Sequence, residues 1–253
     1  MSIKITAQQL SMRFKDRVLF HIPELSIGPN DTIYLKGDNG VGKTTLLKIL
    51  AGLIKPSSGE LAPPLRSFWS KLGLSKKNQG VIYLHQTPYL FDGSVYQNVA
   101  YGIRYQSFDK SPLLDKKHSH LNTAQDIRTQ VIHALKMVGL ETLADEHISV
   151  LSGGERQRVA MARAWILKPS ILLMDEPSAS LDQESIERLV IMAQDLIDRG
   201  ASLVITSHQT NALTDLCKKQ WWIKETTLIE SPLLHMIPKN NRQESSYVTS
   251  STN

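Results

Sequence analysis

Residues 37–44 form a glycine-rich loop, and their spacing restricts the fold more than any other feature of the chain. They read GDNGVGKT and match the pattern G-x-x-x-x-G-K-[ST]. An apolar strand candidate, TIYLK, precedes the loop, and an amphipathic helix candidate, TTLLKILAGL, follows it. This order of strand, loop and helix favours a phosphate-binding loop over the alternative, a glycine-rich turn that merely connects the two elements.

The residue types in this loop suit the phosphate groups of a nucleotide. Glycines let the backbone turn tightly and direct successive N–H groups toward phosphate oxygens, while the helix N-terminus adds positive potential. In such a loop Lys43 would reach the β- and γ-phosphates, and the Thr44 hydroxyl would ligate Mg²⁺. The predicted nucleotide contacts in this segment are Gly37, Asp38, Asn39, Gly40, Val41, Gly42, Lys43, Thr44 and Thr45.

Short apolar runs recur along the chain and predict a sheet. They lie at 33–35, 81–84, 171–174, 203–206 and 221–223. Several are almost uninterrupted Val, Ile and Leu, which is typical of strands buried on both faces. Helical patterns lie between them, most clearly over 183–199, where Gly200 gives a stop signal. Alternating strands and helices predict an α/β fold with a mostly parallel sheet.

The stretch from about 94 to 147 follows a different pattern, since it has no good strand candidate. Helices predicted over 94–104 and 123–138 flank the polar loop SFDKSPLLDKKHSH. We therefore expect residues 93–147 to form a helical subdomain inserted into the α/β domain. From Ser231 onward the sequence turns polar, and residues 231–253 are expected to form a flexible tail.

Two acidic residues end one of the apolar runs. The segment ILLMDEP at 171–177 would deliver Asp175 and Glu176 to the carboxyl edge of the sheet, where ligands bind in open α/β folds. Asp175 is predicted to hold Mg²⁺, directly or through water. Glu176 would point to the opposite side and is predicted to orient or deprotonate an attacking water. Alone, this pattern is also a common loop entry, but the phosphate loop favours the functional interpretation.

Composition excludes several classes of protein. The chain of 253 residues is 41% hydrophobic and 21% charged, which excludes disorder as the main state and excludes rod-like folds. No apolar run approaches the roughly 18 residues that cross a bilayer, so no membrane span is expected. A single cysteine, Cys217, cannot form an internal disulfide, which suits a reducing cytosol. The net charge of +5 leans only slightly toward anionic partners.

The segment LSGGERQ at 151–157 resembles a known family most closely. Locally, Ser152 and Glu155 form a capping-box pattern that opens a helix running to about Leu167. The whole string resembles the signature, LSGGQ or LSGGE, of the ATP-binding-cassette (ABC) family. In that family this helix N-terminus faces the γ-phosphate of ATP held by a second subunit. The resemblance therefore adds to the nucleotide contacts Ser152, Gly153, Gly154 and Glu155.

Four further positions follow the order of the family's motifs. Gln86 corresponds to the glutamine that meets Mg²⁺ and water and senses the membrane partner. Asp182, in SASLD, corresponds to the acidic residue of the D-loop, and it would also serve as the nucleotide contact from that loop. His208 corresponds to the switch histidine that hydrogen-bonds the γ-phosphate, and Phe14 to the aromatic residue that stacks on adenine. Each has a structural alternative: a polar strand end for Gln86 and His208, a helix N-cap for Asp182, and a core aromatic for Phe14.

The sequence departs from the family pattern in two places. Pro29-Asn30-Asp31 replaces the usual Glu-x-Gly before the phosphate-loop strand, and the hairpin WWIKETTLIE lacks the usual glycine. Trp221 and Trp222 in that hairpin are expected to be sheet residues rather than a nucleic-acid stacking platform. His118 and His120 are too few for a metal site.

The resemblance covers residues 1–230 and implies an ABC-type ATPase. Its fold would be a P-loop NTPase (RecA-like) core with an N-terminal antiparallel β part. It implies ATP and Mg²⁺ as cofactors and a head-to-tail homodimer with ATP at each interface. A transporter would need separate membrane permease subunits, which would place the chain on the cytoplasmic face of the inner membrane. A solute-binding protein is a further candidate partner, and no nucleic acid is expected.

The segment YLFDGSVYQNVAYG at 89–102 resembles importer cassettes, in which it begins the helical subdomain that grips the permease. The likeness is greatest to ATPases of oxyanion importers, such as those for tungstate, molybdate or phosphate. The short sequence after the core favours a tungstate-like or other small-solute system over importers with a C-terminal regulatory domain. Two alternatives stay open: an ATPase of a lipid or lipoprotein export or mechanotransmission complex, and a soluble ABC ATPase acting on nucleic acid.

Overall fold

The computed structural model describes residues 4–62, 80–108, 124–179 and 181–233. Within these ranges no helix is both long enough and apolar enough to cross a membrane.

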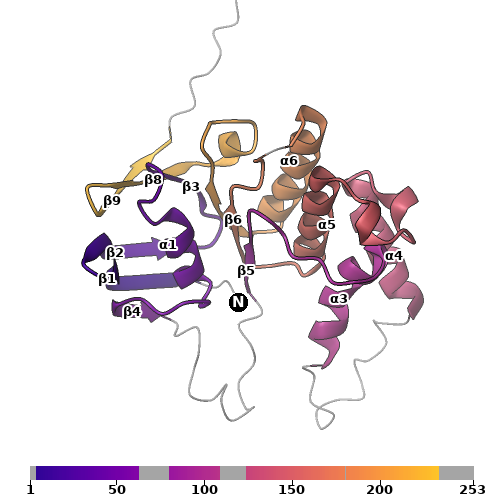
Figure 1. The fold of residues 1–253 in the computed structure, drawn as a ribbon, viewed down its shortest axis with the longest axis horizontal. Coiled ribbons are helices and arrows are strands. Elements are labelled where there is room, and N and C mark those ends of the chain that lie inside the picture. Colours follow the sequence, from indigo (N-terminus) through magenta and orange to yellow (C-terminus); the bar gives the residue numbers. More distant parts are fainter. Residues whose placement is uncertain (1–3, 63–79, 109–123, 180, 234–253) are drawn as a thin grey trace, which may run out of the picture.

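A six-stranded sheet runs through the molecule (Figure 1). Its strands are β3 (Thr32–Lys36), β5 (Val81–Leu84), β6 (Ile171–Asp175), β7 (Ser202–Thr206), β8 (Lys219–Lys224) and β9 (Thr227–Pro232). They are ordered β5-β6-β7-β3-β8-β9, and all pairs are parallel except β8 with β9. Every apolar run predicted as a strand lies in this sheet, which confirms the predicted α/β class and its mostly parallel sheet.

The middle strands are apolar at almost every position because both faces of the sheet are covered. Every residue of β6 and β7 is buried. Successive side chains of a strand point to opposite faces. Thus Leu173 and Val204 belong to one hydrophobic core, whereas Met174 and Ile205 belong to the core on the other face. This arrangement accounts for the continuous apolar runs in the sequence.

One face of the sheet is covered by α1 (Lys43–Leu50) and by a second, antiparallel sheet. That sheet has the order β2-β1-β4 and consists of β1 (Ile5–Phe14), β2 (Arg17–Ile27) and β4 (Ser58–Ala62). Leu46, Leu47 and Leu50 of α1 are fully buried in the core that the two sheets share. The predicted N-terminal antiparallel part is therefore present, and it packs over the helix that follows the phosphate loop (Figure 1).

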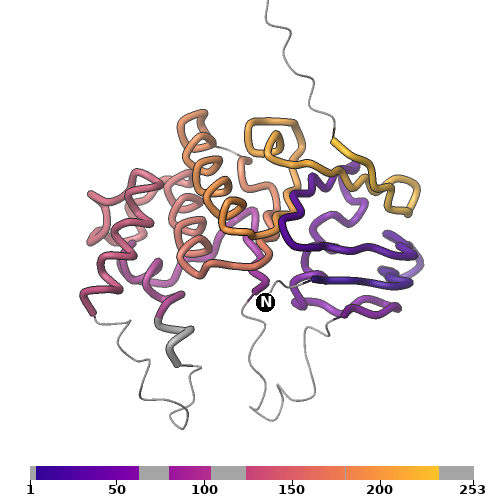
Figure 2. The backbone as a smooth tube through the Cα atoms, turned by 180° about the vertical axis from the view of Figure 1, so that it is seen from behind, coloured from indigo at the N-terminus to yellow at the C-terminus, as the bar shows by residue number. Residues whose placement is uncertain are grey.

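Four longer helices lie on the other side of the molecule (Figure 2). They are α3 (Val95–Phe108), α4 (Ala124–Met137), α5 (Gly153–Ile166) and α6 (Gln183–Asp198). Helices α5 and α6 contribute to the second core together with β6 and β7, and α3 and α4 pack against α5 at the far end. The helices expected at 94–104 and 123–138 are both present, and the first continues four residues further, to Phe108. Short 3₁₀ helices lie at Glu141–Leu143, Ile148–Val150 and Thr214–Leu216.

The helix ends follow the signals in the sequence. Ser152 accepts a hydrogen bond from the Glu155 backbone N–H, and the Glu155 carboxylate accepts one from the Ser152 N–H, which confirms the capping box. Asp182 caps α6, since its carboxylate accepts from Ser185 N at 2.8 Å. Gly200 follows α6 with φ of 92°, a left-handed conformation that glycine adopts without strain.

The two departures from the family pattern form ordered turns. Asp31 accepts a hydrogen bond from Gly28 N at 2.7 Å, and it pairs with Lys219 at 2.8 Å. In the closing hairpin Glu225 and Thr226 both have positive φ, 48° and 69°, as a two-residue hairpin turn requires. The hairpin therefore forms without glycine. The polar tail was expected to begin at Ser231, but Ser231 and Pro232 belong to β9. Residues 234–253 lie outside the described residues, as do His118 and His120.

The two tryptophans are sheet residues, as predicted. Trp221 is fully buried, and its indole N–H donates to Glu230 at 2.8 Å across the β8–β9 pair. Trp222 points to the opposite face, where the ammonium groups of Lys36 and Lys224 each lie 5.3 Å from its ring centroid.

Candidate functional site

The phosphate loop joins β3 to α1, and two of its glycines are needed for its shape. Gly42 has φ of 105°, and a Cβ there would lie 3.0 Å from the ring of Phe20. A Cβ on Gly37 would lie 2.9 Å from a Val41 methyl group and 3.0 Å from the Ile223 carbonyl oxygen. A side chain at either position would force the loop open, so the glycines keep its backbone tight against the end of the sheet.

Lys43 begins α1 and is almost fully buried. Its ammonium donates to the carbonyl oxygens of Gly37 at 2.7 Å and Asp38 at 3.1 Å. Among the described residues no carboxylate pairs with it. A buried ammonium bound only by neutral oxygens is stabilised by an anion, and the loop that holds it opens toward a cavity.

Asp175, at the end of β6, is also buried and is held by hydroxyl groups. Its Oδ2 accepts from the Tyr83 hydroxyl at 2.9 Å, and its Oδ1 accepts from Thr206 at 2.9 Å. Burial and the charge of Asp175 raise the pKa of Tyr83 well above its ordinary value, so the phenol stays a hydrogen-bond donor. In the part of the chain that the structure describes, no cation pairs with this carboxylate, which favours a cation supplied by a ligand.

Glu176 follows immediately and turns its carboxylate the other way. Its φ of 49° is unusual for a residue with a side chain. Gln86 Nε2 donates to Glu176 Oε2 at 2.8 Å, and His208 Nε2 lies 2.8 Å from Oε1, so that ring nitrogen donates as well. Three residues from β5, β6 and β7 ends thus meet, as expected for strands whose carboxyl ends share one edge.

Lys43 and Glu176 line the same cavity, whereas Asp175 is not among the residues that line it. Its volume is about 330 Å³, and it is lined by Leu19, Asn39, Gly40, Gly42, Lys43, Thr44, Thr45, Gln86, Glu176 and His208. Its lining thus combines a lysine and two threonine hydroxyl groups with an acid and the two hydrogen-bond partners of that acid. This combination suits a phosphate chain and the water that attacks it.

The donor set beside the phosphate loop also fits Mg²⁺. The Thr44 hydroxyl, the free amide oxygen of Gln86 and the Asp175 carboxylate are all oxygen ligands, which Mg²⁺ prefers. No cluster of three or more His, Cys, Asp or Glu side chains that could hold a metal occurs among the described residues. Mg²⁺ is typically bound by one or two carboxylates together with substrate phosphates. A single carboxylate from the protein is therefore compatible with Mg²⁺ binding.

The predicted signature residues do not line this cavity in the described structure. Ser152 and Gly153 are exposed at the N-terminus of α5, and a Cβ on Gly153 would meet no atom within 4 Å. The hydrogen bonds from the Ser152 N–H and hydroxyl lower the pKa of Glu155, so the capping carboxylate is ionised. This helix end is therefore open to a ligand brought by another molecule.

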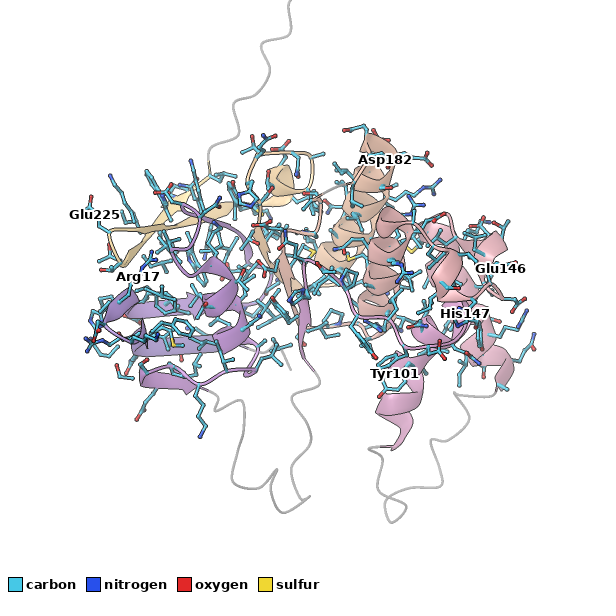
Figure 3. The ribbon with its side chains drawn as sticks, in the orientation of Figure 1. Arg17, Tyr101, Glu146, His147, Asp182 and Glu225 are labelled. Carbon is cyan, nitrogen blue, oxygen red and sulfur yellow. The ribbon has the colours of Figure 1, made fainter. Side chains whose placement is uncertain are left out.

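Asp182 and Phe14 also lie outside the cavity lining. Figure 3 shows Asp182 at the helical side of the molecule, far from Arg17 in the antiparallel sheet. Hydrogen bonds from the Ser185 side chain and N–H lower the pKa of Asp182, in keeping with its role as an N-cap. Phe14 is 55% exposed, so the alternative of a core aromatic is wrong. Phe14 is the last residue of β1, just before the turn to β2. Arg17, at the start of β2, donates a hydrogen bond from its guanidinium to the phosphate-loop carbonyl oxygen of Gly40 at 3.3 Å.

Four residues at the site escaped sequence reasoning. They are Arg17 and Leu19, which approach the loop from β2, and Tyr83 and Thr206, which hold Asp175. Arg17 and Leu19 carry no local signal, because their contact depends on how the second sheet packs. Thr206 carries such a signal, because it is a polar residue that directly follows the apolar run at 203–205, and a buried polar side chain needs a hydrogen-bond partner.

Comparison with known proteins gives consistent results. The family model described as "ABC transporter" matches residues 20–179. The methionine import ATP-binding protein MetN of Chlamydia pneumoniae is 32% identical over 225 residues, which are 84% of this chain and 60% of that protein. The sulfate/thiosulfate import ATP-binding protein CysA of Pectobacterium atrosepticum is 35% identical over 192 residues, which are 75% of this chain and 54% of that protein. The chain thus spans little more than half the length of these two relatives.

The fold is also known from solved structures. A dimer of the ATP-binding cassette MJ0796, in a post-hydrolysis state bound to ADP and Pi, superimposes with a TM-score of 0.75. The match covers 92% of this chain and 100% of that chain at 22% sequence identity. At that identity the likeness establishes the fold.

Proposed function

The chain belongs to the ABC transporter family of ATP-binding subunits, and from this premise we propose that it hydrolyses ATP to drive a solute through separate membrane permease subunits. The observation that carries this proposal is the cavity in which the phosphate loop faces Gln86, Glu176 and His208. A site that binds and hydrolyses a nucleotide accounts for both a buried lysine and a hydrogen-bonded acid in the lining of one cavity.

The phosphate loop binds the triphosphate. Lys43 presents its ammonium to the β- and γ-phosphates, and the N–H groups at the start of α1 face the same oxygens. The other loop residues, from Gly37 to Thr45, shape this cradle. Phe14 stacks on the adenine, because it is the exposed aromatic residue of the turn that Arg17 ties to the loop.

Hydrolysis is assigned to the groups on the facing side. Glu176 accepts a proton from the attacking water, and His208 and Gln86 hold its carboxylate in place by hydrogen bonds. When Glu176 forms a hydrogen bond to the attacking water in place of His208, His208 Nε2 becomes free to donate to the γ-phosphate. Mg²⁺ would be held by Thr44, Gln86 and Asp175, and it supplies positive charge that polarises the phosphate oxygens.

A second copy of the chain completes the site. Ser152 and Gly153 are exposed at the N-terminus of α5, beside the partly buried Gly154 and Glu155, and a helix N-terminus attracts anions through its backbone N–H groups. In a head-to-tail homodimer these residues close over ATP held by the partner, and Asp182 lies near the same interface. The dimeric cassette with the same fold supports this arrangement.

The helical side of the molecule is proposed to contact the permease on the cytoplasmic face of the inner membrane. Tyr89 is 74% exposed, Phe91 37% and Tyr101 46%, and their rings contact one another. Phe91 and Tyr101 also line an apolar cavity of about 200 Å³ together with Arg163. Exposed aromatic clusters of this kind mark protein interfaces. A solute-binding protein would act on the far side of the permease.

The solute is proposed to be a small oxyanion such as tungstate, molybdate or phosphate. Support comes from the sequence likeness of residues 89–102 and from the relative named for sulfate/thiosulfate import. A methionine-import relative has a similar identity, so sequence likeness of the cassette alone does not identify the solute. The oxyanion proposal therefore needs a test on the assembled complex.

The experiment is affinity capture of tagged Glu176→Gln from detergent-solubilised membranes, with and without ATP. A polytopic membrane protein that is enriched with ATP supports the transport function, and stimulation of the wild-type complex by tungstate or molybdate, but not by methionine, supports the oxyanion. Co-purification of nucleic acid or ribosomes without a membrane protein would refute the transport function. A partner complex that extracts lipid or lipoprotein would establish export instead of import.

A further inference from the structure

The carboxylate of Asp175 is held on both sides by hydroxyl groups from neighbouring strands. Tyr83 on β5 donates to Oδ2, and Thr206 on β7 donates to Oδ1, each at 2.9 Å. Strand β6, which carries Asp175, lies between β5 and β7. Each carboxylate oxygen therefore has one neutral donor, and the plane of the group is fixed while its negative charge is kept.

The Thr206 hydroxyl makes a second contact, to the next residue. It accepts a hydrogen bond from the Glu176 backbone N–H at 2.8 Å. That N–H belongs to a residue whose φ is 49°, a conformation that costs energy for any residue but glycine. One buried hydroxyl group thus donates to Asp175 and accepts from Glu176, and Thr206 itself is fully buried.

We propose that Thr206 is a positioning residue that sets Asp175 and Glu176 in their working orientations through a single hydroxyl group, with Tyr83 holding the other oxygen of Asp175. This inference rests on the proposed function, in which Asp175 binds Mg²⁺ and Glu176 acts on water. It assigns the two hydroxyl groups separate effects. Tyr83 acts on the metal ligand alone, whereas Thr206 acts on the metal ligand and on the strained backbone of the base.

The physical consequences of losing each hydroxyl differ. Without the Tyr83 hydroxyl, Asp175 can rotate, and metal binding weakens by roughly 10- to 100-fold, the usual effect of removing a group that orients a metal ligand. Excess Mg²⁺ restores activity, because Glu176 is untouched. Without the Thr206 hydroxyl, the Glu176 N–H loses its acceptor as well. Turnover then stays low at saturating Mg²⁺, because the left-handed turn that aims the Glu176 carboxylate is no longer held.

The variants are Thr206→Val, which keeps the branched shape, Thr206→Ser, which restores the hydroxyl, and Tyr83→Phe. Thr32→Val is the matched control, since Thr32 is a buried threonine of the same sheet whose hydroxyl accepts a hydrogen bond from Lys218 N, away from Asp175 and Glu176. Asp175→Asn serves as the benchmark for lost metal binding.

Binding of Mn²⁺ to the ATP-loaded protein is measured by electron paramagnetic resonance in the Glu176→Gln background. ATP turnover is measured as a function of Mg²⁺ concentration in the same variants without the Glu176→Gln substitution.

We expect weaker Mn²⁺ binding in Thr206→Val and Tyr83→Phe, recovery in Thr206→Ser and no change in Thr32→Val. We also expect only Thr206→Val to keep a low turnover at saturating Mg²⁺. The inference is overturned if Asp175→Asn loses Mn²⁺ while both hydroxyl variants bind it like the wild type. If Asp175→Asn itself binds Mn²⁺ normally, the proposed metal ligand is wrong instead. Should Thr206→Val fail to fold, Tyr83→Phe tests the predicted effect on metal binding. Thr206→Ala, which also removes the hydroxyl group, then tests the predicted effect on turnover at saturating Mg²⁺.

Discussion

Replacing Glu176 by glutamine tests the assignment of the catalytic base most directly. The substitution keeps the shape of the side chain and removes its capacity to accept a proton. General-base catalysis contributes about 10²–10⁴ in rate, so turnover at saturating ATP should fall by that factor, or about 3–5 kcal/mol of activation free energy. ATP binding should be unchanged, because the triphosphate is assigned to Lys43 and the phosphate loop and not to Glu176.

The cost of the same substitution to the fold is small. Glu176 accepts from Gln86 and from His208, and a glutamine retains only one acceptor oxygen. One of these two hydrogen bonds must therefore be lost or reversed, which His208 allows by shifting its proton to the other ring nitrogen. The expected loss of stability is at most about 1 kcal/mol. The backbone N–H keeps its bond to Thr206, and the strain at φ of 49° is the same for either residue.

The measurements are phosphate release at saturating ATP, equilibrium binding of a fluorescent ATP analogue, and the melting temperature. Glu184→Gln is the matched control, since Glu184 is an exposed acid on α6 that pairs only with Arg188 four residues later. It should hydrolyse ATP at the wild-type rate. Near-normal turnover in Glu176→Gln would refute the role of this residue as the base, and lost ATP binding would show that the change disturbs the loop.

Lys43→Ala should weaken ATP binding by about 10- to 100-fold, because a charged hydrogen-bond donor to the phosphates is lost; a wild-type dissociation constant for a labelled ATP analogue would contradict this. Asp182→Ala should lower the urea midpoint of unfolding because the helix cap is lost, whereas Asp182→Asn should keep the cap, and urea titrations of both variants would separate capping from any role in the dimer. Burial raises the pKa of Cys217 to about 12, so iodoacetamide at pH 8 should modify it only after unfolding, and rapid labelling of the native protein would contradict its burial. Because folding raises this pKa, the stability contributed by the neutral thiol is present below about pH 8.5 and is lost as the pH rises toward 12, which pH-dependent unfolding would detect.

The sequence predicted those parts of the fold that depend on neighbouring residues. The apolar runs identified the strands of the main sheet, and the glycines identified the loop between β3 and α1. The pattern of Ser152 and Glu155 identified the start of α5 correctly, because a capping box is closed within four residues. The order of the strands could not be obtained in this way, since β5 and β6 are adjacent in the sheet although their paired residues Leu84 and Met174 are 90 positions apart in the chain.

 Altogether 86 residues lie between Leu84, where β5 ends, and Ile171, where β6 begins. A pairing over such a distance is decided by packing and not by local sequence.

The contacts of Asp175 follow from the register of the sheet, which the sequence does not specify locally. Thr206 lies directly opposite Asp175 in the parallel pair of β6 and β7. Because side chains alternate between the faces of a sheet, a shift of one residue would turn Thr206 away and bring Ile205 or Ser207 opposite the acid. The polar residue in LVIT therefore indicates that a buried partner exists, but only the packed sheet identifies that partner as the acid at the end of β6. The same reasoning explains why the motifs identified residues that line the cavity, such as Lys43 and Glu176, whereas the hydroxyl groups that hold Asp175 were found only in the structure.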